Sequence, residues 1–321
     1  MILTVTINPL LEQRLTYNKV STGNQNRNGK LVFAAGGKGI NVSRQLNKMN
    51  VENIVLTFAG GTNGKVFRSS IQTEGINFSI INTASETRVC TVVVDSSVNS
   101  ITHFFSENQN ISREEVQKFI LKMEKMIENC EIVIFSGSSP CEETDIIFPT
   151  GIEIANKLGK PSFCDTYGNH LKKCYKASPT VVHNNIEEVE CSLQIDLNTK
   201  KDKLAFLDQL YRKNIKQVFL TNGPEKSYAS NFDFHYEVSV PNINYVDSTG
   251  SGDSFFAGIA NGWHKSMVFE DQVKLGTALG AVNASTFNVS NVDFQKASRL
   301  MDNIEVIPVG KKLNMIDDTP N

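Results

Sequence analysis

Hydrophobic and polar positions along the chain follow two alternating periods. Short apolar runs at residues 2–7, 51–58, 132–135 and 163–166 predict buried strands. Between them, apolar residues recur every three or four positions and predict helices at residues 65–73, 112–129, 146–158, 171–175 and 271–287. Strands that alternate with helices are typical of a mostly parallel sheet with helices on both faces. We therefore predict an α/β fold.

Two regions break this alternation. Residues 15–33 are polar and rich in turn-forming residues, as expected for small strands outside a main core. Residues 87–95 and 100–105 are apolar runs separated by a Ser-Ser-Val-Asn turn, and they predict a β-hairpin. We expect a small second sheet, built from about residues 12–35 and 86–107, within a single domain spanning residues 1–321. After Asn303 we expect a short strand and then a disordered tail.

Residues 244–262 predict a strand, a glycine turn and a helix. Gly250 and Gly252 interrupt an extended run, and apolar residues then recur every four positions from residue 255 to residue 263. Glycines at a helix start let backbone N–H groups face an anion. Asp253 lies beside this turn. The pattern by itself is equally compatible with a plain strand-to-helix loop in which Asp253 is an N-cap.

Two other phosphate-binding motifs are missing from the sequence. Phe255 stands where a dinucleotide-binding fingerprint has its third glycine, and no acidic residue follows in a second strand about twenty residues on. Residues 59–66 approach a Walker loop but begin with alanine and end with valine. Neither a dinucleotide fold nor a P-loop enzyme is therefore indicated.

Composition narrows the class of protein. The 321 residues are 40% hydrophobic and 21% charged, as in ordinary globular proteins, and suit one large α/β domain. A net charge of −2 gives no broad basic surface for nucleic acid or an anionic membrane. The six cysteines include no C-x-x-C pair, and we expect them to be reduced thiols. The sequence lacks a signal-like N-terminus and long apolar runs, so we expect a cytoplasmic protein that is neither exported nor membrane-spanning.

The run D-S-T-G-S-G-D-S at residues 247–254 resembles the D-T-x-G-A-G-D signature of ribokinase-like (phosphofructokinase B type) carbohydrate kinases. The similarity is to the branch of 1-phosphofructokinase and tagatose-6-phosphate kinase. It implies that Gly250, Ser251 and Gly252 hold the phosphoryl group in transit and that Asp253 accepts the proton of a sugar hydroxyl. It also implies that the small sheet is a β lid over the sugar site, often with a dimer contact.

A second motif lies on the expected sugar side. The run A-A-G-G-K-G-I-N-V-S-R-Q-L at residues 34–46 resembles the family's G-G-K-G-x-N-V-A. The resemblance implies that Gly36, Gly37 and Asn41 contact the sugar. Lys38 is either a further sugar contact or a solvated charge at a helix start.

Two shorter motifs complete the sugar side. The run S-G-S-S-P at residues 136–140 resembles S-G-S-L-P-P-G and makes Ser138 a matching sugar contact. The family's N-P-x-x-D aspartate is replaced by Glu12, which is one methylene longer. This replacement leaves the identity of the sugar open, and Glu12 could also be a solvated acid. Asp165, in C-D-T-Y-G, either shapes the site from a strand end or satisfies loop amides.

The expected nucleotide side departs more from the family. The run V-V-H-N-N-I-E-E at residues 181–188 resembles I-K-P-N-x-x-E-L, whose Asn and Glu organise the water shell of Mg²⁺. Asn185 and Glu188 match, and a cation held mainly by phosphates and waters needs few protein ligands. His183 and Asn184 replace the lysine and proline, which removes one cation from the nucleotide phosphates.

The remaining ATP contacts come from two segments. Residues 218–225 resemble V-S-L-G-x-x-G and retain Thr221 and Gly223, whereas Lys226 replaces the last glycine. Ser248 of the signature is assigned to ATP with them. A requirement for a monovalent cation is left open.

Two arginines bear on the charge of the substrate. A sugar phosphate carries a charge near −2, which arginine forks or lysines neutralise best. Arg88, in E-T-R-V-C, resembles the arginine of the branch's E-T-R-I motif. Arg27 precedes Gly36 with the spacing of the branch's N-R-V arginine, which in some relatives reaches the neighbouring subunit's site. Taken singly, either could be a solvated lid charge.

The resemblance implies ATP-dependent phosphorylation of fructose 1-phosphate or tagatose 6-phosphate to the bisphosphate, with Mg²⁺ and a homodimer formed through the lid. The sequence does not decide between the two sugars. A kinase for an unphosphorylated sugar or nucleoside would share Asp253 and its turn. The departures at Glu12, His183 and Asn184 also fit a catalytically weakened sugar-phosphate-binding protein.

Overall fold

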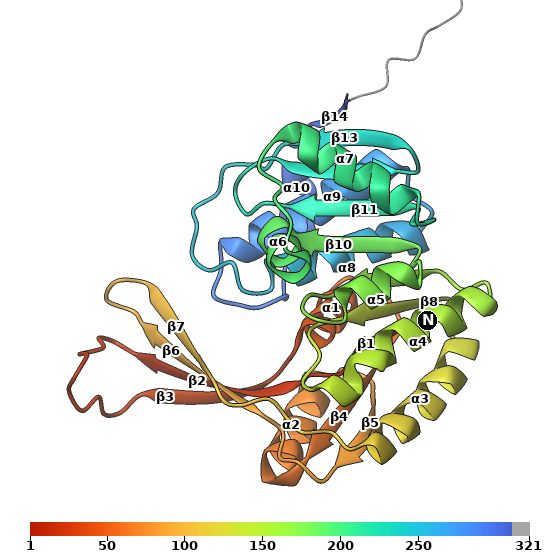
Figure 1. Cartoon of the computed structure of the whole chain (residues 1–321). Helices are drawn as coiled ribbons and strands as arrows, with labels where there is room; N and C mark the ends of the chain where they lie inside the picture. The colour runs from red at the N-terminus through yellow and green to blue at the C-terminus, as the bar shows by residue number, and fades with distance from the viewer. Residues whose placement is uncertain (310–321) are drawn as a thin grey trace, which may run out of the picture.

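The computed structural model of the protein describes residues 1–309, and its largest element is a ten-stranded sheet. The strands of this sheet are β1 (Ile2–Thr6), β4 (Asn53–Gly60), β5 (Phe78–Thr83), β8 (Ile132–Ser136), β9 (Ser162–Asp165), β10 (Val181–Asn185), β11 (Gln217–Thr221), β12 (Ser227–Asn231), β13 (Phe234–Val238) and β14 (Val306–Val309). They lie in the order β14-β13-β12-β11-β10-β9-β8-β1-β4-β5 (Figure 1). The strands from β11 to β5 in that order pair in parallel, whereas β12, β13 and β14 are antiparallel. The predicted mostly parallel sheet is confirmed.

Helices cover both faces of this sheet because successive side chains of a buried strand point to opposite sides. In β8, Val133 and Phe135 join one buried cluster, and Ile132 and Ile134 join the other. The first cluster packs under α3 (Arg113–Glu128), α4 (Ile147–Lys157), α5 (Leu171–Lys176), α6 (Ile186–Leu193) and α7 (Lys200–Tyr211). The second packs under α1 (Lys38–Lys48), α8 (Ser251–His264), α9 (Phe269–Ala284) and α10 (Phe294–Met301). The short 3₁₀ helix η1 (Glu142–Ile146) precedes α4, and α2 (Gly61–Thr73) packs on β4 beside the smaller sheet.

The predicted small second sheet is confirmed. It contains β2 (Leu10–Tyr17), β3 (Lys30–Gly36), β6 (Val89–Asp95) and β7 (Ser100–Phe105), in the order β3-β2-β6-β7. The β2–β6 pair is parallel and the other two pairs are antiparallel. This sheet, called the lid below, projects from the body of the molecule (Figure 1). Large apolar side chains are exposed on it, namely Leu31, Val32, Phe33, Phe104 and Phe105.

One predicted element is wrong and several were not predicted. No strand precedes the glycine turn, because residues 239–248 are neither strand nor helix. The backbone amides of Val246 and Asp247 instead donate to the carbonyl of Ala284 at the end of α9. Pro241 lacks an N–H group, which disfavours pairing of this run in a sheet. The hydrophobic pattern predicts no element at β5, β10, β11, β12, β13, α6, α7 or α10.

The C-terminal prediction is confirmed as far as the structure describes the chain. The expected short strand after Asn303 is β14, which pairs with β13. The predicted disordered tail falls on residues 310–321, outside the described residues. No helix within residues 1–309 has the length and apolar character needed to cross a membrane.

Candidate active site

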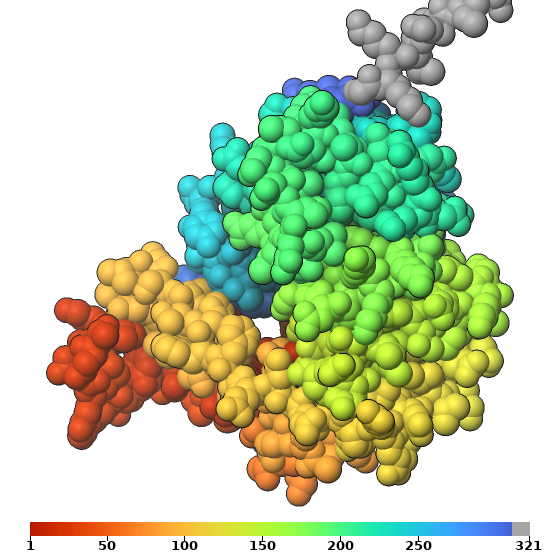
Figure 2. Space-filling view, viewed as in Figure 1, coloured from red at the N-terminus to blue at the C-terminus, as the bar shows by residue number. Residues whose placement is uncertain are grey.

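A cavity of about 1360 Å³ opens between the lid and the ends of the parallel strands. Figure 2 shows the hollow where the lid meets the body. Ligands of open α/β sheets bind at this carboxyl edge. The cavity is lined by most of the predicted site residues, namely Glu12, Gly36, Gly37, Lys38, Asn41, Arg88, Asn185, Glu188, Thr221, Gly223, Ser248, Gly250, Ser251, Gly252 and Asp253.

Two predicted residues do not line this cavity. Ser138, just after β8, accepts a hydrogen bond from Nδ2 of Asn8 at 3.0 Å. Arg27 is exposed in the loop between β2 and β3, where it donates to the side chain of Gln25. The chain's own cavity therefore gives Arg27 no role, and its predicted contact with a neighbouring subunit stays a prediction.

The glycine turn has a backbone that only glycine adopts without strain. Gly250 is the N-cap of α8, with φ at 79°. A Cβ atom there would lie 2.5 Å from Cγ1 of Val289, so both conformation and space require glycine. The buried Asn283 of α9 holds the turn from behind, since its Nδ2 donates to the carbonyl of Thr249 at 2.8 Å and to Oγ of Ser251 at 3.1 Å.

The amides of the turn are not equivalent. The N–H of Ser251 already donates to the carbonyl of Ser248 at 2.9 Å. No backbone partner within residues 1–309 is assigned to the N–H groups of Gly252 and Asp253, which are at the positive end of α8. Unpaired amides in the first turn of a helix form an anion-binding site. In the predicted anion hole, the donors for an anion are therefore the amides of Gly252 and Asp253, and the amide of Ser251 is excluded.

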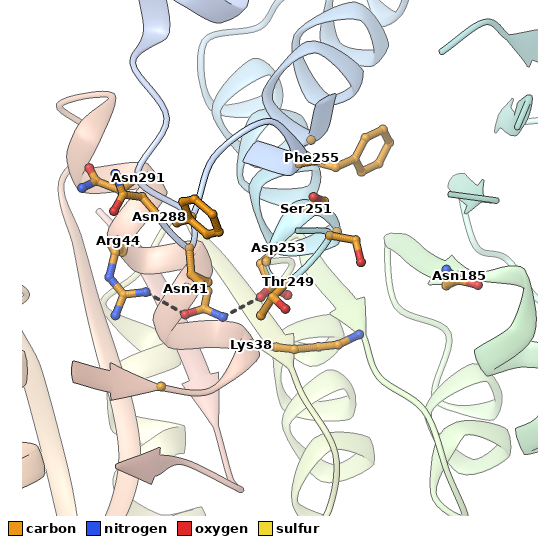
Figure 3. A pocket seen from close by; sticks show the side chains of 18 of the residues that line it. Lys38, Asn41, Arg44, Asn185, Thr249, Ser251, Asp253, Phe255, Asn288 and Asn291 are labelled. Carbon is orange, nitrogen blue, oxygen red and sulfur yellow. Dashed lines mark hydrogen bonds between the residues drawn. The ribbon is translucent and has the colours of Figure 1, made fainter. Parts of the chain in front are cut away.

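Asp253 combines burial with a specific hydrogen bond. Its side chain is 4% exposed, and its Oδ2 accepts from Nδ2 of Asn41 at 2.7 Å (Figure 3). Burial raises the pKa of Asp253 to about 7, the negative charges of Asp165 and Glu188 add to the rise, and Lys38 and Asn41 oppose it. A carboxylate with a pKa near neutrality is suited to accept a proton.

Lys38 is the central cation of the cavity. Its Nζ lies 2.8 Å from Oε1 of Glu188, 3.2 Å from Oδ1 of Asp165 and 4.9 Å from the ring centre of Tyr167. Burial alone would lower the pKa of Lys38, but the carboxylates of Asp165, Glu188 and Asp253 raise it above its ordinary value. The Lys38 ammonium is thus paired with carboxylates inside the cavity and is not a solvated surface charge.

His183 occupies the place of the family's lysine and is 2% exposed. Its ring centre lies 5.0 Å from that of Phe255, and its Nε2 lies 3.1 Å from Oγ1 of Thr221. A Cβ atom on Gly252 would come within 3.2 Å of His183 Cε1, so the ring supports the glycine turn from below. Asp165 lies beside it, with Oδ1 3.5 Å from Nδ1. Burial would raise the pKa of Asp165, but Lys38 and His183 hold it well below its ordinary value.

The lid contributes charged side chains from β2. Oε1 of Glu12 accepts from Nε of Arg14 at 2.9 Å, so Glu12 is a paired acid that faces the cavity. Arg14 was not predicted. Its Nη1 also donates to the carbonyl of Phe287, in the loop after α9, at 2.9 Å.

Arg88 lies where the lid joins the body. Its Nη2 donates to the carbonyl of Asn8 at 3.1 Å, and its Nη1 donates to Oδ1 of Asn108 at 3.3 Å. The guanidinium lies 5.9 Å from the ring centre of Phe105. Burial lowers the pKa of Arg88 from its ordinary value, but a guanidinium stays charged. Arg88 is therefore an oriented cation at the wall of the cavity.

The two residues predicted to contact a metal ion through water, Asn185 and Glu188, already accept backbone hydrogen bonds. Oδ1 of Asn185 accepts from the N–H of Glu187, and Oε2 of Glu188 accepts from the N–H of Asn185 at 3.4 Å. Within residues 1–309 no group of three or more His, Cys, Asp or Glu side chains is placed to hold a metal ion. Asn185 and Glu188 keep further oxygen lone pairs and line the cavity, which fits a cation contacted through water.

Sequence analysis also missed Arg44 and Tyr167, which line the cavity. Both lie in segments that resemble motifs of the kinase family. Arg44 follows Asn41 by three residues, a spacing that puts the two side chains on one face of a helix. Tyr167 follows Asp165 by two. Helical spacing could therefore have identified Arg44, whereas no periodic signal marks Tyr167.

Comparisons with known proteins agree over nearly the whole chain. The family model for pfkB family carbohydrate kinases matches residues 10–296. The tagatose-6-phosphate kinase of Staphylococcus epidermidis is 28% identical over 312 residues, which cover 96% of this chain and 100% of that relative.

Solved structures share the fold. One described as a "possible 1-phosphofructokinase" from Thermotoga maritima has a TM-score of 0.87 at 22% identity and covers 96% of this chain and 99% of that chain. Phosphofructokinase-2 from Escherichia coli in complex with fructose-6-phosphate has a TM-score of 0.83 at 21% identity, with 94% and 99% covered. The same enzyme in complex with potassium has a TM-score of 0.85 at 20% identity, with 94% and 98% covered. These likenesses confirm the ribokinase-like α/β fold.

Proposed function

The chain belongs to the pfkB family of carbohydrate kinases, and we propose that it transfers a phosphoryl group from ATP to a hexose monophosphate, producing the bisphosphate. Fructose 1-phosphate and tagatose 6-phosphate are the proposed substrates. The tagatose-6-phosphate kinase relative and the fructose-6-phosphate complex of a structural neighbour support a phosphorylated sugar.

The observation that carries this proposal is the surroundings of Asp253. A buried carboxylate with a pKa near 7 is next to two unpaired amides at the positive end of α8. Asp253 accepts the proton of the attacking hydroxyl, and the amides of Gly252 and Asp253 stabilise the phosphoryl group in transit. Lys38 adds a permanent positive charge close by. The chemistry then depends mainly on positioning and charge stabilisation.

The two ends of the substrates have different partners. Glu12, Gly36, Gly37 and Asn41 contact the sugar hydroxyls, and Arg88 binds the phosphate that the sugar already carries. Thr221, Gly223 and Ser248 contact ATP, and Ser138 approaches the sugar only if its loop moves. Asn185 and Glu188 would hold Mg²⁺ through water, and the bound cation would neutralise charge on the ATP phosphates. The potassium complex of a structural neighbour favours testing a monovalent cation as well.

The proposal extends to assembly and location. Val32 and Phe105 line the cavity, whereas Leu31, Phe33 and Phe104 are exposed on the lid without lining it, and a second copy of the chain would cover these three side chains. Such a homodimer could bring Arg27 to the neighbouring cavity. We propose one catalytic domain with this lid, acting in the cytoplasm on small molecules rather than on nucleic acid or membranes.

A substrate panel tests the proposal. Purified protein, ATP and Mg²⁺ are assayed with fructose 1-phosphate, tagatose 6-phosphate, fructose 6-phosphate, free hexoses and nucleosides. Asp253→Ala should lower turnover by roughly two to four decades, the usual effect of removing a positioned base, while ATP binding persists. Preference for an unphosphorylated substrate would replace this proposal with a ribokinase- or nucleoside-kinase-type activity. Sugar-phosphate binding without turnover would instead indicate a binding protein.

A further inference from the structure

Arg44 makes contacts that connect the glycine motif to Asp253. It lies on α1, one turn after Asn41, and is only partly exposed. Its Nη1 donates to Oδ1 of Asn41 at 2.7 Å, and Nδ2 of Asn41 donates to Oδ2 of Asp253 at 2.7 Å. Figure 3 shows these two hydrogen bonds as separate dashed lines, one from Arg44 to Asn41 and one from Asn41 to Asp253.

The side-chain amide of Asn41 has two orientations, and only one suits a carboxylate partner. With the NH₂ group toward Asp253, the carbonyl oxygen faces Arg44, and both contacts are favourable. In the flipped orientation the NH₂ group would face the guanidinium and the oxygen would face the carboxylate, so donors would meet donors and acceptors would meet acceptors. Arg44 therefore fixes Asn41 as a donor to Asp253.

Arg44 is itself held by groups that lie outside the predicted site. Its Nε donates to Oε2 of Glu74, the C-cap residue of α2, at 2.6 Å. Its Nη2 donates to the carbonyl of Ala35, and Oε1 of Glu74 accepts from the N–H of Ala35 at 3.2 Å. Ala35 lies at the end of β3, directly before the glycine motif. The guanidinium thus has a charge-neutralising partner and a fixed plane, which a lysine could not reproduce.

We propose that Arg44 is a positioning residue for the reaction: anchored by Glu74, it locks the Asn41 amide in the orientation that favours the ionised form of Asp253 and leaves the second carboxylate oxygen free for the sugar hydroxyl. This inference rests on the proposed role of Asp253 as the base. Arg44 need not touch either substrate.

The sign of the effect follows from the groups around Asp253. Lys38 on α1 faces it with positive charge, whereas Asp165 at the end of β9 and Glu188 on α6 face it with negative charge. The ring of His183, on β10, packs against Gly252, which lies in the same turn of α8 as Asp253. The hydrogen bond from Asn41 is stronger to the ionised form of Asp253 than to the protonated form, so an unlocked amide would favour protonation of Asp253. Loss of Arg44 should therefore raise the pH needed to ionise the base.

Four variants test this inference. Arg44→Met and Arg44→Gln remove the cation, and Arg44→Lys retains a cationic donor. Lys65→Met removes an exposed charge on α2 that does not line the cavity, and it serves as the matched control. In the neutral variants, we expect the acid limb of the pH profile of kcat/KM to move up by roughly one pH unit. Activity should then fall about tenfold below the limb and less than about threefold above it. Arg44→Lys should shift the limb less, and Lys65→Met should not shift it.

A second readout needs no substrate. The effect of Asp253 on folding stability is obtained by comparing each variant with the same variant that also carries Asp253→Asn. Without Arg44, the pH range over which Asp253 lowers stability should extend about one pH unit higher. This readout remains valid if the protein does not phosphorylate hexose phosphates, so it separates the two proposals. An equal loss of activity at every pH, with an unchanged stability window in both neutral variants, would reduce Arg44 to a packing residue and overturn the inference.

Discussion

Asp253→Asn should make the ligand-free protein more stable, and increasingly so as the pH rises. The folded protein binds the Asp253 proton more tightly than the unfolded chain, because the pKa is raised from 3.8 to about 7. The stability contributed by this proton is fully present below 3.8 and is lost as the pH rises through about 7. Asparagine has no proton to lose, so the variant avoids this loss.

The magnitude follows from the width of this window. About three pH units separate the two values, and each unit corresponds to about 1.4 kcal/mol, which gives an upper limit of roughly 4 kcal/mol. The variant also loses the charge-assisted hydrogen bond from Asn41, so the net gain is smaller. The pH-dependent part is independent of that loss. Between about pH 5.5 and pH 8.5, the gap between variant and wild type should widen by roughly 2 kcal/mol.

Urea denaturation of both proteins at these two pH values, followed by circular dichroism, measures the gap. Asp196→Asn provides the matched control, because it makes the same substitution at an exposed loop position. It should show no comparable widening. A constant gap across the pH range, or a wild type that gains on the variant at high pH, would refute the reasoning that burial keeps Asp253 protonated near neutrality.

Three further predictions concern other parts of the molecule. Arg88→Ala should raise KM for a hexose monophosphate by about one to two decades, the ~1.5–3 kcal/mol of a charge-assisted hydrogen bond, with ATP affinity nearly unchanged in calorimetry; an equal effect on both substrates would contradict a phosphate contact. Gly250→Ala should lower the free energy of unfolding by roughly 1–3 kcal/mol more than Gly75→Ala, since both glycines have positive φ but only Gly250 has a neighbour that a Cβ would strike. Phe104→Lys should convert a dimer to monomers in analytical ultracentrifugation, whereas Leu121→Lys, exposed on α3, should not; a monomeric wild type would remove the lid interface.

The strands and helices that sequence reasoning identified share a strong hydrophobic period. β1, β4 and β8 are mainly apolar runs because both of their faces are buried. β12 lacks this signal, since Ser227 and Ser230 are buried within it. The false strand before Gly250 has the opposite cause. Its local preference for extended backbone is real, but the amides of Val246 and Asp247 donate to the end of α9 rather than to a strand.

The same distinction applies to the site. Gly250, Asp253 and Asn41 lie in short motifs whose chemistry is local, so a sequence can reveal them. The hydrogen bond between Arg44 and Glu74 joins two helices, and the sequence of neither helix predicts that these two side chains meet. The resemblance predicts only a lost phosphate contact at His183, whereas its ring also packs against the glycine turn, a role that depends on tertiary packing and not on residue spacing.

The hydrogen bond from Arg14 to the carbonyl of Phe287 makes the two walls of the cavity thermodynamically interdependent. Arg14 belongs to the lid, and Phe287 belongs to the loop that follows α9. A ligand that strengthens this hydrogen bond when it binds to the lid also favours the binding of a second ligand that strengthens the bond from the loop. The effect of each ligand on the affinity for the other must be equal. One hydrogen bond of about 1 kcal/mol limits this coupling to about fivefold. Sugar phosphate and nucleotide should therefore strengthen each other's binding by at most that factor through Arg14, and calorimetry on Arg14→Ala should find that share missing.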